Sequence, residues 1–347
     1  VLAVFFVFLG SLLSNDLGWE MQDMFNQLMV LPNVIALIAM SGAVATCAKS
    51  HNGKKKALEP AQAEEAESAA PEAGTESAEI EGLWALIGVT AEELETYVAG
   101  VVAAEMPASF EPEALKAQAV AARTYAVRDM LQTGGGFPQG QAYRSPEEQA
   151  ALWGEDYPVW AEKIRQAVAA TRGEILTYEQ EPILAVFCAA SAGVTESAGN
   201  VWSTDLPYLQ SVASPGDREA PQFAVTVRIP REQAAAALLA ACPAAGDLSG
   251  DLSPKLRIEE YTPAGYVKTV RVGAGSLTGR QFREALGLRS SAFTLEFAGD
   301  ELVVTTRGHG HGAGMSQYGA QALAREGKAY REILAYYYQN CDLVKME

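Results

Sequence analysis

Residues 90–131, TAEELETYVAGVVAAEMPASFEPEALKAQAVAARTYAVRDML, predict two consecutive helices. Thr90 and Glu93 form a capping box, so we expect the first helix to begin here. Apolar residues then recur at the spacing of one buried helix face: Leu94, Tyr97, Val98, Val101 and Val102. Pro107 cannot continue a helix, so the first helix is expected to end just before it.

Glu105 stands where this pattern calls for an apolar side chain. At 100° per residue it lies about 20° around the helix from Leu94. Burial and the negative end of the helix dipole both disfavour a charged carboxylate, so we expect its pKa to be raised. A carboxylic acid that keeps its proton near neutral pH can act as a general acid. The alternative is a glutamate at the edge of the core that reaches water or pairs with an arginine.

The second predicted helix runs from Glu113 to Leu131, with Pro112 suited to its first turn. Its many alanines allow close packing against neighbouring elements. Arg123 lies on this helix, and two roles are open for it. It is either the partner that keeps Glu105 charged or a ligand for a polar substrate.

The rest of the chain predicts an α+β fold in which a helical N-terminal part packs on a β-rich half. The first part continues with a glycine-rich loop at 133–150, a helix at 158–171 closed by Gly173, and two strands at 174–178 and 183–189 that form a hairpin. The β-rich half comprises strands at 223–229 and 265–272, a hairpin at 293–306 that turns at Gly299-Asp300, and short helices near 231–241 and 278–286.

Two polar segments are candidates for the walls of a cleft. Residues 188–202, CAASAGVTESAGNVW, are rich in small and hydroxyl side chains, and an ordinary polar loop is the equally simple interpretation. Residues 307–320, RGHGHGAGMSQYGA, lack the spacing of a phosphate-binding motif, so nucleotide binding is not expected. They are expected to form one wall of a polar pocket and to open a helix; a glycine-rich turn with incidental histidines is the alternative.

A metal site is not expected in this second segment. In an extended conformation His309 and His311 would point to the same side, as in metal sites. The third histidine, His51, lies outside the predicted domain, so Cys188 or carboxylates would have to complete the ligand set.

Charge and cysteine content exclude several classes of protein. The 347-residue chain has a formal net charge of −17 and a single short lysine cluster, Lys54 to Lys56, so it is not expected to bind nucleic acid. Its cysteines are scattered and form no CxxC motif: Cys47, Cys188, Cys242 and Cys341. Neither a zinc ribbon nor a dense disulfide framework is indicated.

The N-terminal region differs from the rest. Apolar runs at 1–14 and 28–47 precede the lysines, which by the positive-inside rule would stay cytoplasmic. Residues 1–50 resemble the C-terminal end of sodium-coupled alanine/glycine symporters. We interpret residues 1–56 as a membrane segment or as an artefact of an upstream reading frame. Residues 57–82 carry eight glutamates and no basic residue, which predicts a disordered acidic linker before a domain at 83–347.

Several motifs together resemble the family of stage II sporulation protein D and the amidase enhancer LytB. They are VVAAEMPASFEPEALKAQAVAARTYA, FCAASAGVTESAGNVW, PYLQSVASPGD and GHGHGAGMSQYGA, in this order over residues 83–347. The resemblance implies an α+β fold, action on peptidoglycan and, for sporulation members, a lytic transglycosylase whose catalytic glutamate matches Glu105. The enzyme would cleave between N-acetylmuramic acid and N-acetylglucosamine and leave a 1,6-anhydro product. The alternative is a peptidoglycan-binding amidase enhancer without catalysis.

The matching motifs also supply the expected binding residues: Arg123, Tyr125, Ser191, Thr195, Glu196, His311, Ser316 and Gln317. The position of His309 is often aromatic in the family, so His311 is favoured as the functional histidine. Some members bind zinc through Cys and His in the segment matched by 188–195. Here Val194 stands where a histidine would be needed, so we expect neither metal nor cofactor. The resemblance implies glycan strands, a cell-wall amidase and a membrane complex as partners, and a membrane-anchored or exported domain that faces the wall.

Overall fold

The computed structural model describes residues 79–80, 83–202 and 204–346. The predicted N-terminal segment at 1–56 and nearly all of the linker at 57–82 lie outside these residues. Within the described ranges, no helix combines the length and the apolar character that a bilayer crossing requires.

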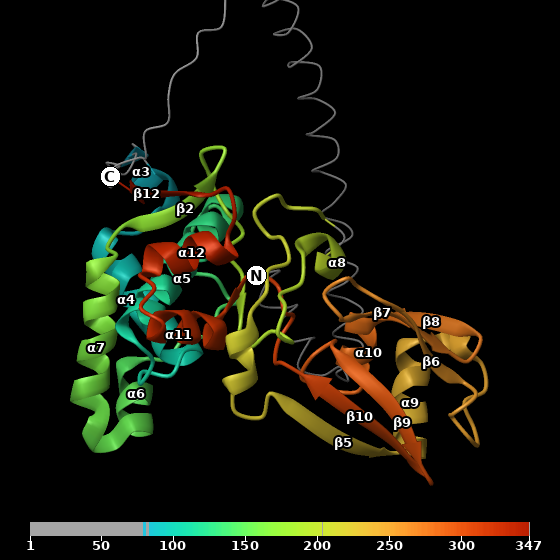
Figure 1. Cartoon of the computed structure of the whole chain (residues 1–347). Coiled ribbons are helices and arrows are strands. Elements are labelled where there is room, and N and C mark those ends of the chain that lie inside the picture. Colours follow the sequence, from blue (N-terminus) through green and yellow to red (C-terminus); the bar gives the residue numbers. More distant parts are fainter. Residues whose placement is uncertain (1–78, 81–82, 203, 347) are drawn as a thin grey trace, which may run out of the picture. The chain divides into compact units, whose positions relative to one another are not determined.

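The predicted pair of helices is present and forms the centre of the helical part (Figure 1). Helix α4 (Ala91–Glu105) follows α3 (Leu83–Ile87) and begins at the capping box of Thr90 and Glu93. Its predicted apolar stripe is buried. Helix α5 (Pro112–Thr133) ends at Gly134, which adopts a left-handed conformation with φ of 83°.

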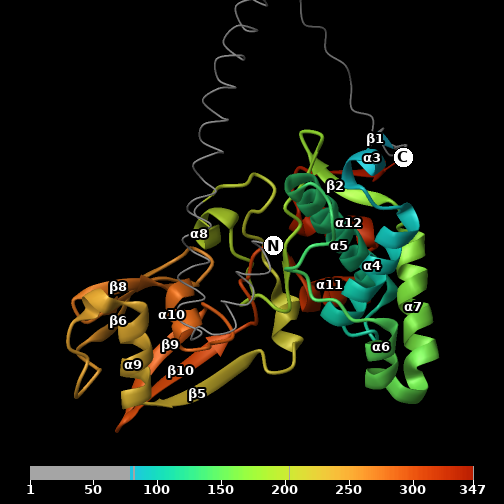
Figure 2. The ribbon, with the colours of Figure 1, turned by 180° about the vertical axis from the view of Figure 1, so that it is seen from behind.

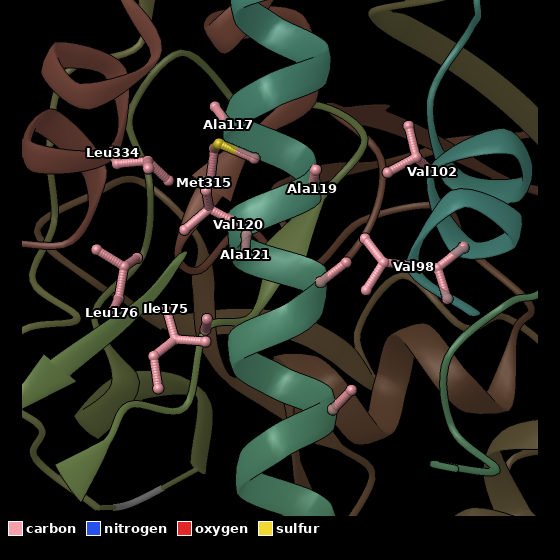
Figure 3. Close-up of a cluster of buried hydrophobic side chains, with 14 of the residues drawn as sticks. Val98, Val102, Ala117, Ala119, Val120, Ala121, Ile175, Leu176, Met315 and Leu334 are labelled. Carbon is pink, nitrogen blue, oxygen red and sulfur yellow. The ribbon is translucent and has the colours of Figure 1, made fainter. Parts of the chain in front are cut away.

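Helix α5 is the core element of the helical part. Figure 3 shows it between Val98 and Val102 of α4 on one side and Ile175, Leu176 and Leu334 on the other. Its alanines let these neighbours approach closely, and full burial of each larger aliphatic side chain contributes about 1.5–3 kcal/mol. Further helices cover this core: α6 (Pro146–Trp153), α7 (Tyr157–Ala170), α11 (Gln317–Arg325) and α12 (Tyr330–Tyr337).

Two small sheets bring distant parts of the chain to this core. The first has the order β1-β12-β2-β3, with strands Glu79–Ile80, Asp342–Met346, Glu174–Tyr178 and Glu181–Pro182. In the second, β4 (Phe187–Cys188) pairs in parallel with β11 (Met315–Ser316). The second pairing joins the two polar segments that the sequence marks as cleft walls. The short helix α8 (Ala198–Trp202) follows the first of these segments.

The β-rich part lies between these two segments in the chain, and Figure 2 shows its strands grouped with α9 and α10. It has its own hydrophobic core. One sheet has the order β5-β10-β9, with strands Ala224–Pro230, Glu301–Arg307 and Phe293–Ala298. The other has the order β6-β7-β8, with strands Leu256–Tyr261, Val267–Val272 and Gly275–Thr278. Helices α9 (Arg231–Ala241) and α10 (Gly279–Ala285) complete it. Short 3-10 helices occur at Gly154–Asp156, Pro215–Glu219 and Pro243–Ala245.

The α+β prediction is confirmed, as are the hairpin at 293–306 and the short helices of the β-rich part. The strand predicted over 183–189 is only partly right: residues 187–188 form β4, but β4 pairs with β11, and the hairpin partner of β2 is β3. After Pro182 the chain forms local bonds, from the amide of Ala185 to the carbonyl of Ile183 and from Val186 to Leu184, so it curls instead of extending the hairpin. The loop predicted at 133–150 is also partly wrong, because α6 begins at Pro146.

Candidate active site

Glu105 is the last residue of α4, as predicted. Met106 caps the helix in an extended conformation and Pro107 follows it. The carboxyl group is partly buried, and the amide of Ala142 donates to its Oε1 at 3.3 Å. Burial raises the pKa of Glu105 above its usual value, while this amide and the neighbouring Gln317 side chain oppose the shift. The carboxyl group is therefore biased toward its protonated form and keeps donors that can stabilise its charged form.

An aromatic stack holds the Ala142 amide against Glu105. Tyr97 of α4 lies between Phe137 and Tyr143, with ring centroids 4.3 and 5.7 Å away. Gly100 lies one turn further along α4 and leaves a notch for Tyr143, because a Cβ at this position would lie 2.2 Å from the tyrosine ring. We call residues 137–144 the strap; the fit of Tyr143 into the notch fixes its position on α4.

Three side-chain hydrogen bonds tie the strap to the two central helices. Gln141 accepts from the Tyr97 hydroxyl at 3.0 Å and donates to the carbonyl of Ala122 at 3.2 Å. Arg144 donates to the carbonyl of Ala103 at 2.9 Å. Sequence reasoning assigned this segment no role beyond that of a loop.

Gln317 reaches Glu105 from the first turn of α11. Ser316 caps this helix by accepting from the amide of Gly319. The Nε2 of Gln317 donates to Oε1 of Gln118 at 3.4 Å, and Nε2 of the buried Gln118 has no hydrogen-bond partner among the described residues. Gln118 is a neighbour of the site that the sequence analysis missed, and its place in an alanine-rich buried helix face gave no signal beyond its polarity.

Ser191 and Ser316 meet at a buried carboxylate, Asp217. Ser191 donates its amide at 2.9 Å and its hydroxyl to Oδ2, and Ser316 donates its hydroxyl to Oδ1. Burial raises the pKa of Asp217, and the serine hydroxyls oppose this shift. The sequence analysis quoted the SPGD motif but gave Asp217 no role. In the structure Asp217 positions the start of α11, and with it Gln317.

Glu196 and His311 line a different region, a cavity of about 440 Å³ whose lining does not include Glu105. Glu196 is 2% exposed and accepts from the amide of Ser197, from Asn200 and from the Thr262 hydroxyl. These donors satisfy its carboxylate fully. Thr195 is buried beside it and bonds the backbone of Val212.

His311 is a neutral side chain. Its Nδ1 accepts from the amide of Ala313 at 3.0 Å, and its ring packs against Trp202 with centroids 5.1 Å apart. Burial lowers the pKa of His311 to about 4. His309 forms backbone bonds in both directions with Ala190, and its ring lies 3.0 Å from Arg289.

The extended conformation considered for this segment is not observed. Gly308, Gly310 and Gly312 have φ of 76°, 110° and 82°, so the chain turns between the two histidines. Within the part of the chain that the structure describes, no three His, Cys, Asp or Glu side chains gather as a metal site would require.

Arg123 does not pair with Glu105. It is completely buried and donates to both carboxylate oxygens of Glu95, at 3.0 and 2.6 Å, and to the carbonyl of Glu174. Of the two roles considered for Arg123, that of charge partner of Glu105 is therefore wrong. Its burial in an ion pair also argues against contact with a substrate. Tyr125, by contrast, is partly exposed and its hydroxyl lies near Gly140 of the strap.

The geometry thus defines an α+β protein with a partly buried carboxyl group of raised pKa between a helix end, a strap and the start of α11. Comparison with known proteins identifies its class. Residues 86–178 match the family model described as Stage II sporulation protein. The chain is 43% identical over 263 residues to Stage II sporulation protein D of Bacillus subtilis strain 168, covering 72% of this chain and 74% of the relative. The chain belongs to this family.

Two other similarities bear on function and organisation. The chain is 28% identical over 294 residues to the Amidase enhancer of Bacillus subtilis strain 168, covering 70% of this chain and 40% of that protein. Residues 1–65 match a second model, the Sodium:alanine symporter family, which agrees with the predicted resemblance of the N-terminal region. That match lies outside the described residues.

Proposed function

We propose that this protein is a lytic transglycosylase that cleaves peptidoglycan between N-acetylmuramic acid and N-acetylglucosamine. The observation that carries the proposal is Glu105, a partly buried carboxyl group with a raised pKa at the end of α4. Membership of a sporulation protein family supports a role in cell-wall remodelling during sporulation, including engulfment. The domain would face the wall, as a membrane-anchored or exported protein.

One carboxyl group is sufficient for this reaction. Protonated Glu105 gives its proton to the glycosidic oxygen as the bond from that oxygen to C1 of N-acetylmuramic acid breaks. The C6 hydroxyl of the same sugar then bonds to C1, and the Glu105 carboxylate takes its proton. The product is a 1,6-anhydro sugar, and Glu105 ends in its starting form. Water is not a reactant, so the second carboxylate of ordinary glycosidases is not needed.

The neighbours of Glu105 match the two charge states of this cycle. Burial favours the acid that begins the reaction. The Ala142 amide and the Gln317 side chain favour the carboxylate that forms after proton transfer. We assign substrate contact to Tyr125, which is partly exposed, and we assign support of the site to Ser191, Ser316 and Gln317, which are buried. Thr195 is also buried, but it lies beside Glu196 and outside this site.

The second candidate function is a non-catalytic wall-binding amidase enhancer. The similarity to the Amidase enhancer of Bacillus subtilis supports it. Such a protein needs a glycan-binding surface and a cell-wall amidase as partner, but no poised acid. In both cases glycan strands are the expected ligand, and a membrane complex is an expected partner.

The test incubates the purified full chain with peptidoglycan and analyses the released fragments by mass spectrometry. Fragments that end in 1,6-anhydro-N-acetylmuramic acid are expected from the parent and not from Glu105→Gln. The matched control is Glu92→Gln, the same change at an exposed position of α4, which should leave the fragments unchanged. Binding without fragments, unaffected by Glu105→Gln, would establish the amidase enhancer instead.

A further inference from the structure

The cavity of about 440 Å³ lies between the segment around Glu196 and the β-rich part, and does not include Glu105 in its lining. Polar and aromatic side chains from both sides surround it: Glu196, Asn200, Trp202, Lys268, Arg283 and His311. A volume of this size accommodates a small ligand or one to two sugar rings. The contacts of each charged group show what kind of ligand the cavity is built for.

Most charges of the cavity are already neutralised or satisfied. Lys268 pairs with Glu260 at 2.7 Å, and Arg280 pairs with Glu284 at 2.8 Å. The Glu196 carboxylate accepts three hydrogen bonds, from Ser197, Asn200 and Thr262. None of these groups needs a ligand as a partner.

Arg283 is different. Its Nε donates to the carbonyl of Leu288 at 3.1 Å, and among the described residues no carboxylate lies within ion-pair distance of its guanidinium. The group is half-buried, and burial together with nearby Arg280 lowers its pKa. A partly desolvated guanidinium with free N–H groups offers the fork that binds a carboxylate through two parallel hydrogen bonds.

The opposite wall suits a sugar ring. Trp202 is partly exposed and packs against the neutral His311, so the two rings present an uncharged aromatic surface. Asn200 adds an amide beside them. Saccharide sites commonly combine an apolar aromatic face with a few polar groups that fix the orientation of the ring.

We propose that this cavity binds a carboxylate-bearing unit of the wall polymer, with Arg283 as the anion-binding residue and Trp202 as the surface for its ring. The proposal rests on the proposed function for the identity of the polymer, and it adds a recognition site separate from Glu105. A carboxylate is favoured over a phosphate dianion because Lys268 and Arg280 are already paired, so Arg283 offers one positive charge, which balances a single negative charge.

Two parts of peptidoglycan could supply this carboxylate, and probes distinguish them. N-acetylmuramic acid and N-acetylglucosamine differ only in the lactyl ether that carries the acid. A D-alanyl-D-alanine peptide presents the carboxylate of a stem peptide without a sugar. NMR chemical-shift titration of the purified full chain with each probe gives the three dissociation constants.

We expect a carboxylate probe to bind more tightly than N-acetylglucosamine, and Arg283→Gln to raise its Kd about tenfold or more. Arg283→Lys, which keeps the charge but loses the fork, should give a smaller rise. The control is Arg271→Gln, the same change in the β-rich part outside the cavity, where Arg271 pairs with Glu259; its Kd should stay within about twofold of the parent.

The outcomes separate this inference from the proposed function. Equal binding of all probes, or equal effects of the Arg283 and Arg271 changes, would overturn the carboxylate site. Glu105→Gln should bind the probes like the parent. If the protein releases anhydro fragments but probe binding does not depend on Arg283, the proposed enzyme activity stands and the carboxylate site is overturned. If probe binding depends on Arg283 but no anhydro fragments form, the carboxylate site stands and the proposed enzyme activity is overturned.

Discussion

The first half and the end of helix α4 carry the same side chain in opposite surroundings. Glu95 is 9% exposed and accepts two bonds from the guanidinium of Arg123. Glu105, ten residues further along the helix, pairs with no cation among the described residues and accepts from a backbone amide instead. The glutamate that pairs with an arginine joins two helices. A buried glutamate without one can exchange a proton.

The largest effect is expected from a change of Glu105, and it concerns strand cleavage. Glu105→Gln keeps the volume of the side chain but cannot donate the proton, so kcat/KM for strand cleavage should fall by up to about 10⁴-fold. The fold should be unaffected, because no ion pair is lost. Fragment release and circular dichroism measured on the same sample check both parts; a variant that still produces anhydro ends would exclude Glu105 as the acid.

For the ion pair of Glu95 and Arg123, the expected effect is on stability. Arg123→Met leaves the Glu95 carboxylate buried without its partner, which should cost about 3–5 kcal/mol in the free energy of unfolding. The double variant Arg123→Met/Glu95→Leu removes both charges and should recover much of this loss. Urea denaturation of both proteins tests the prediction, and equal stability of the single and the double variant would show that the pair is not the cause.

A change at Gly100, in the middle of α4, should disturb Glu105 and leave the ion pair of Glu95 intact. Gly100→Ala places a Cβ in the notch for Tyr143, so the strap must move and Ala142 loses its position at Glu105. We expect a stability loss of about 1–3 kcal/mol from overpacking and roughly a tenfold loss of kcat/KM.

The pH profile distinguishes this change from general damage to the fold. The Ala142 amide favours the charged form of Glu105, so its loss should raise the pKa of Glu105 further and move the alkaline limb of the profile to higher pH. Adding Tyr143→Ala should relieve the overpacking without restoring the profile. An unshifted limb in Gly100→Ala would contradict the role of the strap.

The smallest expected effect is a pH-dependent change in the free energy of unfolding. The pKa of Glu105 is raised in the folded state, so its contribution to stability is present at low pH and is lost as pH rises through the folded-state pKa. Glu105→Gln should therefore gain stability at pH 7 relative to the parent, and the gain should vanish below about pH 4. Partial exposure screens the effect, which should stay under about 1 kcal/mol. Unfolding curves at both pH values measure it.

Local signals predicted the elements of this helix better than its partners. The Thr90 capping box, the apolar stripe and Pro107 define α4 and place Glu105 at its end. Ser145 and Glu148 form a second capping box that would have predicted α6, although the glycines before it favoured a loop. The strand predicted at 183–189 is present only at 187–188, because apolar composition does not show whether backbone bonds are made locally or across a ladder.

The site was predicted only where its residues are close in sequence or share a family motif. The Arg123 to Glu95 pair joins two helices, and no pattern along the chain indicates which carboxylate an arginine will meet. Asp217 and Gln118 were missed for the same reason, because both matter through contacts that packing creates. The direction of the Glu105 pKa shift was predictable because the position of Glu105 on the apolar face of α4 implies burial, although the strap and α11, which lie beside it, were not predicted as its neighbours.

The backbone amide of Gly308 donates to the carbonyl of Phe223 at 2.8 Å. The chain leaves the helical part after residue 223 and returns at residue 308, so the two crossing points are neighbours. A module of 84 residues, from 224 to 307, with its own hydrophobic core can thus be exchanged, shortened or deleted by joining adjacent ends. Evolution could alter the module that holds Arg283 while leaving the acid at Glu105 in place.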